Sequence, residues 1–408
     1  MSRLVARTVE LDPAVQPFDG AGDRDRIVWS SGARSLVAWG CAASVDAGTG
    51  DHRFERASSE LQRIFNGLDV DDAVDGWATG PLAFGAFAFD PDSPSSPVMV
   101  PSFVLGRDGD RAWFTTIGDH SAPEPSPRPA RSVDRGRAQV RRIGSSVRDG
   151  RWLGAVASAR AAVADGIVDK VVLARDASVI SDQSFSVHDI IVELAAMYPS
   201  CFTFSLDGLV GATPELLVRR RGRDVGSIVL GGSAPRGRSA AADERLAADL
   251  VASEKHRREH ELAVVTVREA LDACCEDVRV DLAPSLLPLP YVQHLRTDVR
   301  ARLTRPLSAL QLAGALHPTA AVCGVPTDKA LATIRELEDL DRGRYCGPVG
   351  WVDARGDGEW GIALRCAEIS GARARLWAGA GIVADSDPRA ELAETELKLH
   401  PLLRALGA

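Results

Sequence analysis

Hydrophobic and polar positions alternate through much of the first part of the chain, with the spacing of β-strands. Residues 26–45 contain two such runs, separated by Ser-Gly-Ala-Arg, and therefore predict two strands. Residues 81–89, 98–105 and 112–117 predict three more strands, and residues 54–65 predict a helix. The pattern of this part is that of an antiparallel sheet.

A proline-rich segment, residues 121–130, interrupts these patterns. Its repeated prolines are unsuited to helix or sheet and predict an exposed, partly extended connection. We place a boundary near it, between a sheet-rich N-terminal half at 1–140 that completes the fold and a larger region at 141–408. We expect the two to form one compact structural unit.

Helical and strand patterns mix irregularly after this connection. The helical patterns cover residues 151–165, 187–197, 241–275, 307–316 and 327–337. Strand patterns cover residues 170–175, several runs within 202–230, and 347–352, 360–368 and 374–378. The basic run 219–223 is typical of a solvated hairpin tip. Such irregular alternation indicates an α+β fold rather than a repeating βαβ sheet.

The stretch 379–398 combines three local signals. Gly-Ala-Gly at its start predicts a turn where backbone can approach a ligand closely. Asp387 and Pro388 then form a start signal for a helix, as N-cap and first helical residue. On that helix Glu391, Glu394 and Lys398 share one face, and leucines occupy the opposite one. The face is either a solvated surface or half of a cation site.

Composition narrows the class of protein. Hydrophobic content of 45% and charged content of 25% are those of a soluble globular chain, and the formal charge of −8 argues against a nucleic-acid partner. Seven cysteines without C-x-x-C spacing indicate reduced thiols, mostly buried, in a cytoplasmic protein. The start of the chain lacks the apolar run of a signal peptide, and no later run is long enough to span a membrane, so we expect neither export nor membrane insertion.

Glu259 lies on the longest helical pattern, with Lys255 four residues before it. Taken alone, the two residues have the spacing of an ordinary surface ion pair. Combined with Glu394, Glu259 would instead complete a two-carboxylate site with room for water and a ligand carboxylate, as Mg²⁺ is usually held.

Seven motifs in one order resemble the chorismate-utilising enzymes, and most closely the isochorismate synthases. The first four are Lys-Val-Val-Leu-Ala-Arg from Lys170, Ala-Thr-Pro-Glu-Leu-Leu from Ala212, Gly-Gly-Ser-Ala-Pro-Arg from Gly231 and Ser-x-Lys-x-x-x-Glu-His from Ser253. The last three are Tyr-Val-Gln-His from Tyr291, His-Pro-Thr from His317, and Gly-Ala-Gly-Ile-Val from Gly379 followed by Glu-x-x-Glu-Thr-x-x-Lys. The match runs through most of 141–408. It implies large antiparallel sheets packed as a sandwich core, with helices outside.

The resemblance also implies chemical roles. Lys170 matches the general base that activates water for attack at C2 of chorismate, which requires a lysine whose pKa is lowered by burial. Glu215 matches the general acid that protonates the departing C4 hydroxyl, aimed by the extended Thr213-Pro214 before it. Glu259 and Glu394 match direct Mg²⁺ ligands, and Glu391 matches a ligand through water. Substrate contacts fall on Gly232, Ser233, Ala321, Tyr345, Arg365, Gly379 and Lys398.

Two positions depart from the family pattern. His256 stands where relatives commonly have Asp or Glu, so one outer carboxylate of the metal site is missing and metal binding is expected to differ. Gly231 replaces an alanine common before the Gly-Ser pair, and we expect that change to be mild. His294 and His317 sit in family motifs, and we expect a structural role for His317.

Among related activities, isochorismate synthase fits best, for menaquinone or siderophore supply. Aminodeoxychorismate synthases carry a nucleophilic lysine where this chain has Gly231, and anthranilate synthases usually lack lysine at position 170. Salicylate synthase, which adds loss of pyruvate, is the close alternative, although the alanines of Thr319-Ala-Ala-Val favour stopping at isochorismate. A non-catalytic chorismate-binding homologue is the alternative from another class. We expect no glutaminase subunit, because water is the nucleophile, and we expect a monomer.

Overall fold

Two large β-sheets form the framework of the protein in a computed structural model, which describes residues 4–15, 26–118 and 139–408. The predicted α+β fold with large, mainly antiparallel sheets is confirmed. The proline-rich segment 121–130 lies outside the described residues. One pair of strands, β1 and β5, runs parallel at the edge of the larger sheet.

The larger sheet has thirteen strands. Its strands follow the order β10 (Val140–Gly144), β11 (Lys170–Ser181), β23 (Arg373–Ile382), β22 (Cys366–Ser370), β13 (Leu209–Thr213), β12 (Phe202–Leu206), β2 (Ile27–Ser31), β3 (Arg34–Trp39), β8 (Phe103–Asp108), β9 (Arg111–Gly118), β1 (Val5–Leu11) and β5 (Asp69–Asp72), and β19 (Gly324–Val325) pairs with β11.

The second sheet has ten strands. Its order is β16 (Cys275–Val280), β18 (Val292–Leu303), β15 (Asp224–Pro235), β14 (Leu216–Arg221), β21 (Gly358–Ile362), β20 (Pro348–Asp353), β6 (Leu82–Ala86), β7 (Val98–Val100) and β4 (Ala43–Val45), and β17 (Ser285–Pro288) pairs with β18.

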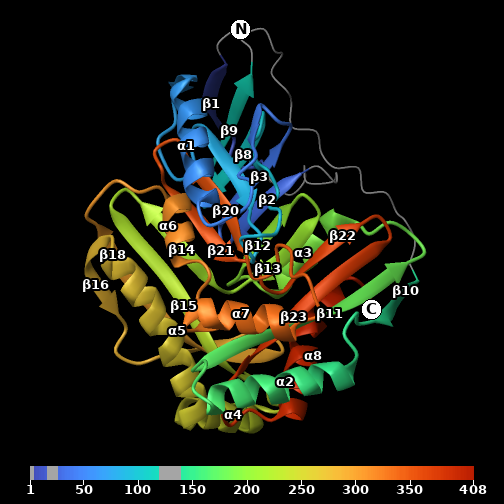
Figure 1. Ribbon diagram of the computed structural model, residues 1–408. Helices are drawn as coiled ribbons and strands as arrows, with labels where there is room; N and C mark the ends of the chain where they lie inside the picture. Colours follow the sequence, from blue (N-terminus) through green and yellow to red (C-terminus); the bar gives the residue numbers. More distant parts are fainter. Residues whose placement is uncertain (1–3, 16–25, 119–138) are drawn as a thin grey trace.

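Strands from the two parts of the sequence share both sheets. In the larger sheet β12 pairs with β2, and in the second sheet β20 pairs with β6, so each sheet joins residues from before and after the proline-rich connection. The expectation of one antiparallel sheet in the first part is therefore wrong. Its strands divide between the two sheets: β2 and β3 continue the larger sheet beside β12 (Figure 1), whereas the hydrophobic strand β6, which is buried on both faces, continues the second sheet.

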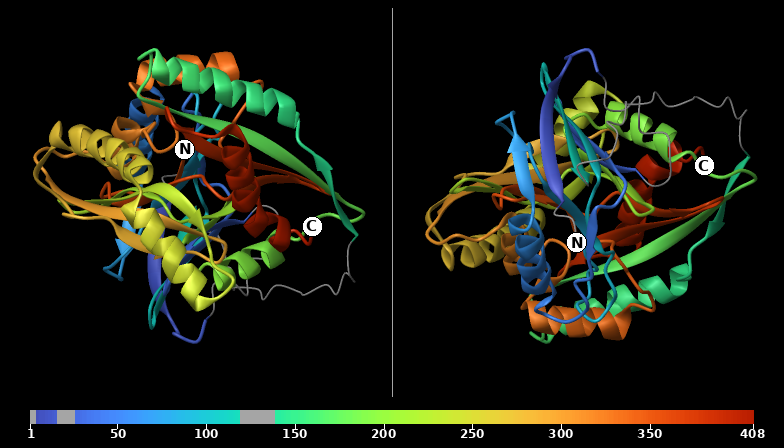
Figure 2. Two further views of the ribbon diagram at one scale, coloured as in Figure 1. Left: turned by 90° about the horizontal axis from the view of Figure 1, so that it is seen from below. Right: turned by 90° about the horizontal axis from the view of Figure 1, so that it is seen from above.

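Eight helices occur in the described residues, and they pack on the outside of this framework (Figure 2). They are α1 (Arg53–Asn66), α2 (Asp149–Ala164), α3 (Val187–Met197), α4 (Ala240–Ala252), α5 (Glu254–Asp272), α6 (Ala309–Leu316), α7 (Thr327–Leu337) and α8 (Pro388–Ala405). None of them is both long and apolar enough to cross a membrane. Helix α5 packs on β15 of the second sheet and α8 packs on β23 of the larger sheet, which brings the two helices to the same region.

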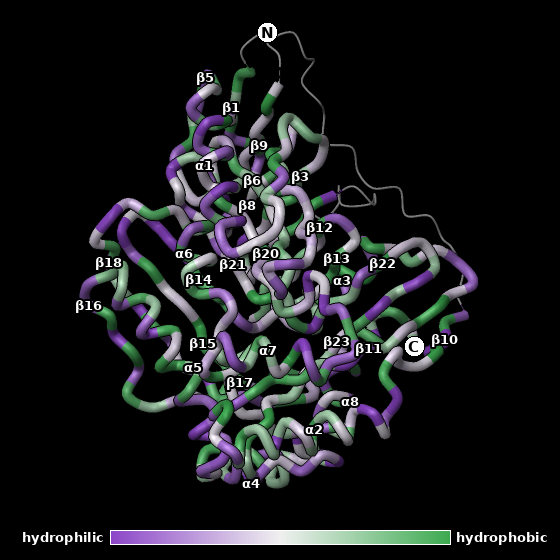
Figure 3. The backbone as a smooth tube through the Cα atoms, in the orientation of Figure 1, coloured by the Kyte–Doolittle hydropathy of each residue, from purple (hydrophilic) through white to green (hydrophobic). Residues whose placement is uncertain are grey.

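The core follows the hydrophobic pattern of the strands, which Figure 3 shows as green segments through the middle of the molecule. Large aromatic side chains such as Trp29, Trp360 and Trp377 are fully buried there. All seven cysteines are free, and six of them are buried, as the sequence predicted.

Three local predictions are wrong. The helical pattern at 241–275 forms two helices, because Ser253 has an extended backbone that ends the first, and its side chain accepts a hydrogen bond from the backbone N–H of His256 to cap the second. The run 360–368 forms two strands, separated by Arg365 in a left-handed conformation with φ 48°. The Gly-Ala-Gly segment at 379–381 is not a turn but part of strand β23.

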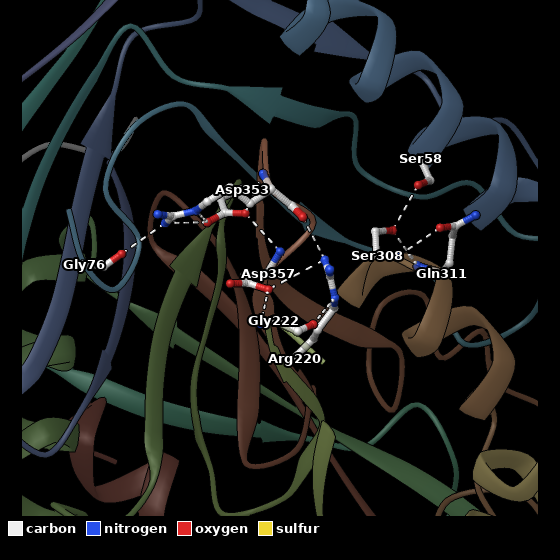
Figure 4. Close-up of polar contacts among 9 residues, drawn as sticks. Ser58, Gly76, Arg220, Gly222, Ser308, Gln311, Asp353 and Asp357 are labelled. Atoms are coloured by element: carbon white, nitrogen blue, oxygen red, sulfur yellow. Dashed lines mark hydrogen bonds and ion pairs between the residues drawn. The ribbon is translucent and has the colours of Figure 1, made fainter. Parts of the chain in front are cut away.

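The hairpin that carries the basic run 219–223 is held by hydrogen bonds to a neighbouring turn, and is not simply exposed to solvent as predicted. Arg220 donates to the carbonyl of Arg355, and the backbone N–H of Gly222 donates to Asp357, in the turn between β20 and β21 (Figure 4). In that turn Asp353 accepts hydrogen bonds from Arg355, and nearby Ser308 caps α6. These contacts fix the far ends of strands whose other ends reach the candidate site.

Candidate active site

A pocket lies between the two sheets, where β11 and β23 of the larger sheet face β15 and β18 of the second. Ten of the sequence-predicted site residues line it: Lys170, Glu215, Gly232, Ser233, Glu259, Ala321, Tyr345, Arg365, Gly379 and Lys398. The other two, Glu391 and Glu394, are not among the lining residues and lie on α8 beside it. Residues that are far apart in the sequence thus meet at one site.

Lys170 and Glu259 form a buried ion pair on one wall of this pocket. The Lys170 Nζ atom lies 3.2 Å from Glu259 Oε1, and the lysine side chain is only 1% exposed. Lys170 is the first residue of β11, whereas Glu259 projects from α5. Burial raises the pKa of Glu259, but the nearby Lys170 and Lys398 outweigh this effect and lower it overall. The expected burial of Lys170 is present, together with a carboxylate partner that the sequence did not predict.

Glu215 occupies the same pocket without an ion-pair partner in the described residues. It lies between β13 and β14, directly after Pro214, and its backbone N–H donates to the side chain of Thr213. Its side chain is buried, at 4% exposed, and burial raises its pKa to about 8. A carboxyl group in this state is protonated near neutral pH and is suited to donate a proton.

Arg365 is a half-buried arginine whose guanidinium contacts an imidazole. Its Nη2 lies 3.1 Å from His294 Nε2, and no carboxylate pairs with it in the parts of the chain that the structure describes. A guanidinium only donates, so Nε2 accepts and the His294 proton is on Nδ1. That Nδ1 lies 3.2 Å from the carbonyl of Gly232 and 3.1 Å from Ser233 Oγ. Burial, with Arg365 beside it, lowers the pKa of His294 well below its usual value, which keeps it neutral. Arg365 is therefore free to bind an anion.

Glycines at three positions let neighbouring groups approach the pocket. A Cβ atom on Gly381 would lie 2.2 Å from Glu259 Oε1 and 2.9 Å from Lys170 Cε, so only glycine leaves room for that ion pair. Gly232 has φ 63° and faces His256. A Cβ on Gly231 would lie 2.9 Å from His260 Cα, so glycine at this departure from the family pattern lets α5 pack closely on β15.

The carboxylates of α8 are each paired with a lysine. Lys398 Nζ contacts Glu394 Oε1 at 2.5 Å and donates to the carbonyl of Gly379 at 2.9 Å. Lys255 pairs with Glu391 at 2.9 Å and not with Glu259, so the ordinary surface pair within α5 is absent. This contact joins α5 to α8. The carboxylate face of α8 is turned inward, because Glu391 is buried.

These carboxylates fit a divalent cation. Burial raises the pKa of Glu391, and the charge of Glu394 raises it further, which shows that the two carboxylates repel each other. Lys398 and His256 lie near both Glu259 and Glu394 and interact with them electrostatically. No group of three His, Cys, Asp or Glu side chains lies close enough to hold a metal within the described residues. Two carboxylates completed by water and an anionic ligand remain the arrangement that suits Mg²⁺.

Sequence reasoning missed several contributors. His294 was placed only in a motif, yet it is the residue that holds Arg365. Gly381 was part of the predicted turn, but its importance comes from a contact between strand and helix that no local pattern reveals. His317 lies outside the pocket lining; its Nε2 lies 3.0 Å from the carbonyl of Phe89, and burial lowers its pKa to about 3. These contacts are those of a structural residue.

Comparison with known proteins identifies the family. The sequence profile described as chorismate binding enzyme matches residues 3–407. The isochorismate synthase DhbC of Bacillus subtilis is 41% identical over 259 residues, which are 60% of this chain and 65% of that protein, just under two thirds of its length. The isochorismate synthase EntC of Escherichia coli K12 is 34% identical over 394 residues, 94% of this chain and 95% of that protein.

A solved structure supports the same assignment. The crystal structure of a putative 2,3-dihydroxybenzoate-specific isochorismate synthase, DhbC from Bacillus anthracis, superposes with a TM-score of 0.81 at 30% identity, and the match covers 96% of this chain and 98% of that one. The resemblance found in the seven motifs is therefore confirmed over the whole chain. The protein belongs to the chorismate binding enzyme family.

Proposed function

We infer that this protein is an isochorismate synthase, which converts chorismate to isochorismate. The relatives that cover most of the chain carry that name, and the pocket contains the groups that the reaction requires. The observation that carries the proposal is the placement of Lys170 and Glu215 in one pocket, the first paired with a carboxylate and the second protonated and unpaired.

The reaction moves a hydroxyl group across the ring without net gain or loss of atoms. Lys170 acts in its neutral amine form: it accepts a proton from a water molecule as the water oxygen bonds to C2, the ring double bonds shift, and the C4–O bond breaks. Glu215 gives its proton to the departing hydroxyl, which leaves as water. A base and an acid in one pocket suit this displacement, because each group acts at a different carbon.

Fixed cations in the pocket match the dianionic substrate. Arg365 has no carboxylate partner among the described residues, and His294 orients its guanidinium, so it can bind a substrate carboxylate directly. Gly232, Ser233, Ala321, Tyr345, Gly379 and Lys398 complete the proposed substrate contacts. Binding by oriented groups places C2 and C4 against Lys170 and Glu215.

Glu259 and Glu394 would hold Mg²⁺ directly, with Glu391 contributing through water. When bound, the ion would neutralise the ring carboxylate of the substrate and help to orient it. Lys170 contacts Glu259 and Lys398 contacts Glu394, so each proposed ligand also has a lysine beside it. His256, one turn before Glu259, brings an imidazole to this region, and its buried Nδ1 has no hydrogen-bond partner among the described residues.

One incubation tests the proposal. The purified protein, chorismate and MgCl₂ are mixed without ammonium, and products are resolved by chromatography. We expect isochorismate, and addition of a chelator should abolish the rate. Salicylate with pyruvate would show the alternative activity, a salicylate synthase, and the absence of any product would show a chorismate-binding homologue without catalysis. A parallel incubation with ammonium should give the same rate, and an aromatic amine formed only there would contradict water as the nucleophile.

A further inference from the structure

The edge of β11 behind the pocket is completed by side chains instead of by a strand. On this edge β19 pairs with Lys170 and Val171, and β10 pairs only from Ser178 onward. The backbone groups of a strand edge require hydrogen-bond partners when they are buried. Between the two short strands, the backbone N–H of Val172 donates to the carbonyl of Cys323 at 2.8 Å. The carbonyl of Val172 and the N–H of Ala174 instead bond to the side chains of Arg342 and Glu338.

Glu338 and Arg342 form a buried ion pair with several backbone contacts. The two side chains are 4% and 3% exposed, and Arg342 Nε donates to Glu338 Oε2 at 2.8 Å. The other Glu338 oxygen accepts the backbone N–H of Ala174 at 2.6 Å, and Arg342 Nη2 donates to the carbonyl of Val172 at 2.7 Å. The pair therefore replaces a missing strand along the part of β11 that follows Lys170.

The same guanidinium reaches a second wall of the pocket. Its Nη1 donates to the carbonyl of Val322 at 2.9 Å, next to Ala321. The guanidinium also stacks over Phe89 at 4.2 Å. Val172 and Val322 both line the pocket, so one side chain connects two of its segments.

We propose that Glu338 and Arg342 are positioning residues for the reaction, which fix the strand of Lys170 relative to the segment of Ala321. Neither side chain lines the pocket, so the pair acts only through these backbone contacts. The planar fork of arginine suits this task, because it donates in several fixed directions at once. The inference rests on the proposed function, in which Lys170 must meet a water molecule at C2.

The test removes the pair without leaving a buried charge. Replacing a buried ion pair by apolar residues of similar volume is often neutral for stability, whereas removing one partner is strongly destabilising. The paired variant Glu338→Met/Arg342→Met should therefore fold. We expect its kcat for isochorismate formation to fall about ten- to hundredfold, because small misplacements of catalytic groups are costly. Its KM should change less than about threefold, because Arg365, His294 and Ser233 are held by other contacts.

A matched control distinguishes positioning from general stability. The pair Asp353 and Arg355 also contains a buried carboxylate, but it lies in the turn at the ends of β20 and β21 that are remote from the pocket (Figure 4). Asp353→Leu/Arg355→Met should keep a kcat within about twofold of the unmodified protein. Amide hydrogen exchange supplies a readout that needs no turnover, since the N–H of Ala174 should exchange faster in the Glu338→Met/Arg342→Met variant only.

Each outcome is decisive. A folded Glu338→Met/Arg342→Met variant with unchanged kcat and unchanged exchange at Ala174 would overturn the positioning role. If that variant does not fold, Arg342→Lys, which keeps the charge but not the fork, must lower kcat at an unchanged melting temperature for the inference to stand. If the unmodified protein produces no isochorismate, the proposed function fails instead, and the exchange of Ala174 still tests the link to β11.

Discussion

Glu215 and Glu259 are carboxylates of one pocket with opposite behaviour. Glu215 has no cationic partner within ion-pair distance among the described residues, and burial raises its pKa to about 8. Glu259 is also surrounded by protein, yet its pKa is lowered, because Lys170 lies 3.2 Å away and Lys398 is near. The difference shows that burial alone does not set the state of a carboxyl group. Its nearest charge decides whether it acts as an acid or as an anion.

The two carboxylates have separate roles in the proposed reaction. Glu215 is the proposed proton donor, whereas Glu259 contacts Lys170 and is a proposed ligand of Mg²⁺. The two carboxylates are carried by different elements, since Glu215 follows strand β13 and Glu259 projects from helix α5. Changes to either side can therefore be tested separately.

The largest loss of activity is expected when Lys170 is replaced. Lys170→Ala should lower kcat by about two to four orders of magnitude, because it removes the proposed general base. The pKa of Glu259 should rise at the same time, since the carboxylate loses its closest cation. Lys170→Arg is the matched control: it keeps a positive charge beside Glu259 but supplies no base. Substantial turnover by Lys170→Arg would exclude the proposed role of Lys170.

A slightly smaller loss is expected on the other side. Glu215→Gln should lower kcat by about two to three orders of magnitude, because the amide cannot donate a proton to the departing hydroxyl. In the unmodified protein kcat should fall as pH rises through about 8, where Glu215 loses its proton. The residual activity of Glu215→Gln should lack this decrease. A pH–rate profile that is identical in both proteins would assign the acid to another group.

Crowding the Glu259 side should have an intermediate effect. Gly381→Ala places a Cβ 2.2 Å from Glu259 Oε1, so the ion pair with Lys170 must shift, and we expect a ten- to hundredfold loss in kcat/KM. Gly226→Ala is the comparison, because Gly226 lies outside the pocket lining and its Cβ would come no closer than 3.9 Å to another group, the carbonyl of Val299. Equal losses in the two variants would show that the Lys170–Glu259 geometry is not the sensitive element.

The smallest effect concerns stability. The pKa of Glu215 in the folded protein is raised above its ordinary value, so the protonated form favours folding and this contribution is lost as pH rises from about 4.5 to about 8. Glu215→Gln should therefore unfold at a higher temperature than the unmodified protein at pH 9, by a few degrees. The difference should shrink toward pH 5. A pH-independent difference between the two melting temperatures would contradict the raised pKa.

Much of the local structure was determined by the sequence itself. The helices at 187–197 and 327–337 and the start of α8 at Asp387 and Pro388 follow from periodicity and capping. The motif residues that were assigned to substrate contact do meet in one pocket. These features depend on neighbours in the chain, or on motifs that the family shares, and can be recognised without coordinates.

Only the tertiary structure decided how the charged groups are paired. Lys255 has the spacing to meet Glu259 but contacts Glu391 on another helix, while Glu259 meets Lys170 on a strand. Gly381 leaves the space that the side chains of Glu259 and Lys170 occupy, and Glu338 completes β11 because its neighbouring strands are short. Such contacts join residues far apart in sequence, and their geometry is set by how sheets and helices pack. Periodicity and capping describe only near neighbours, so they contain no information about these pairings.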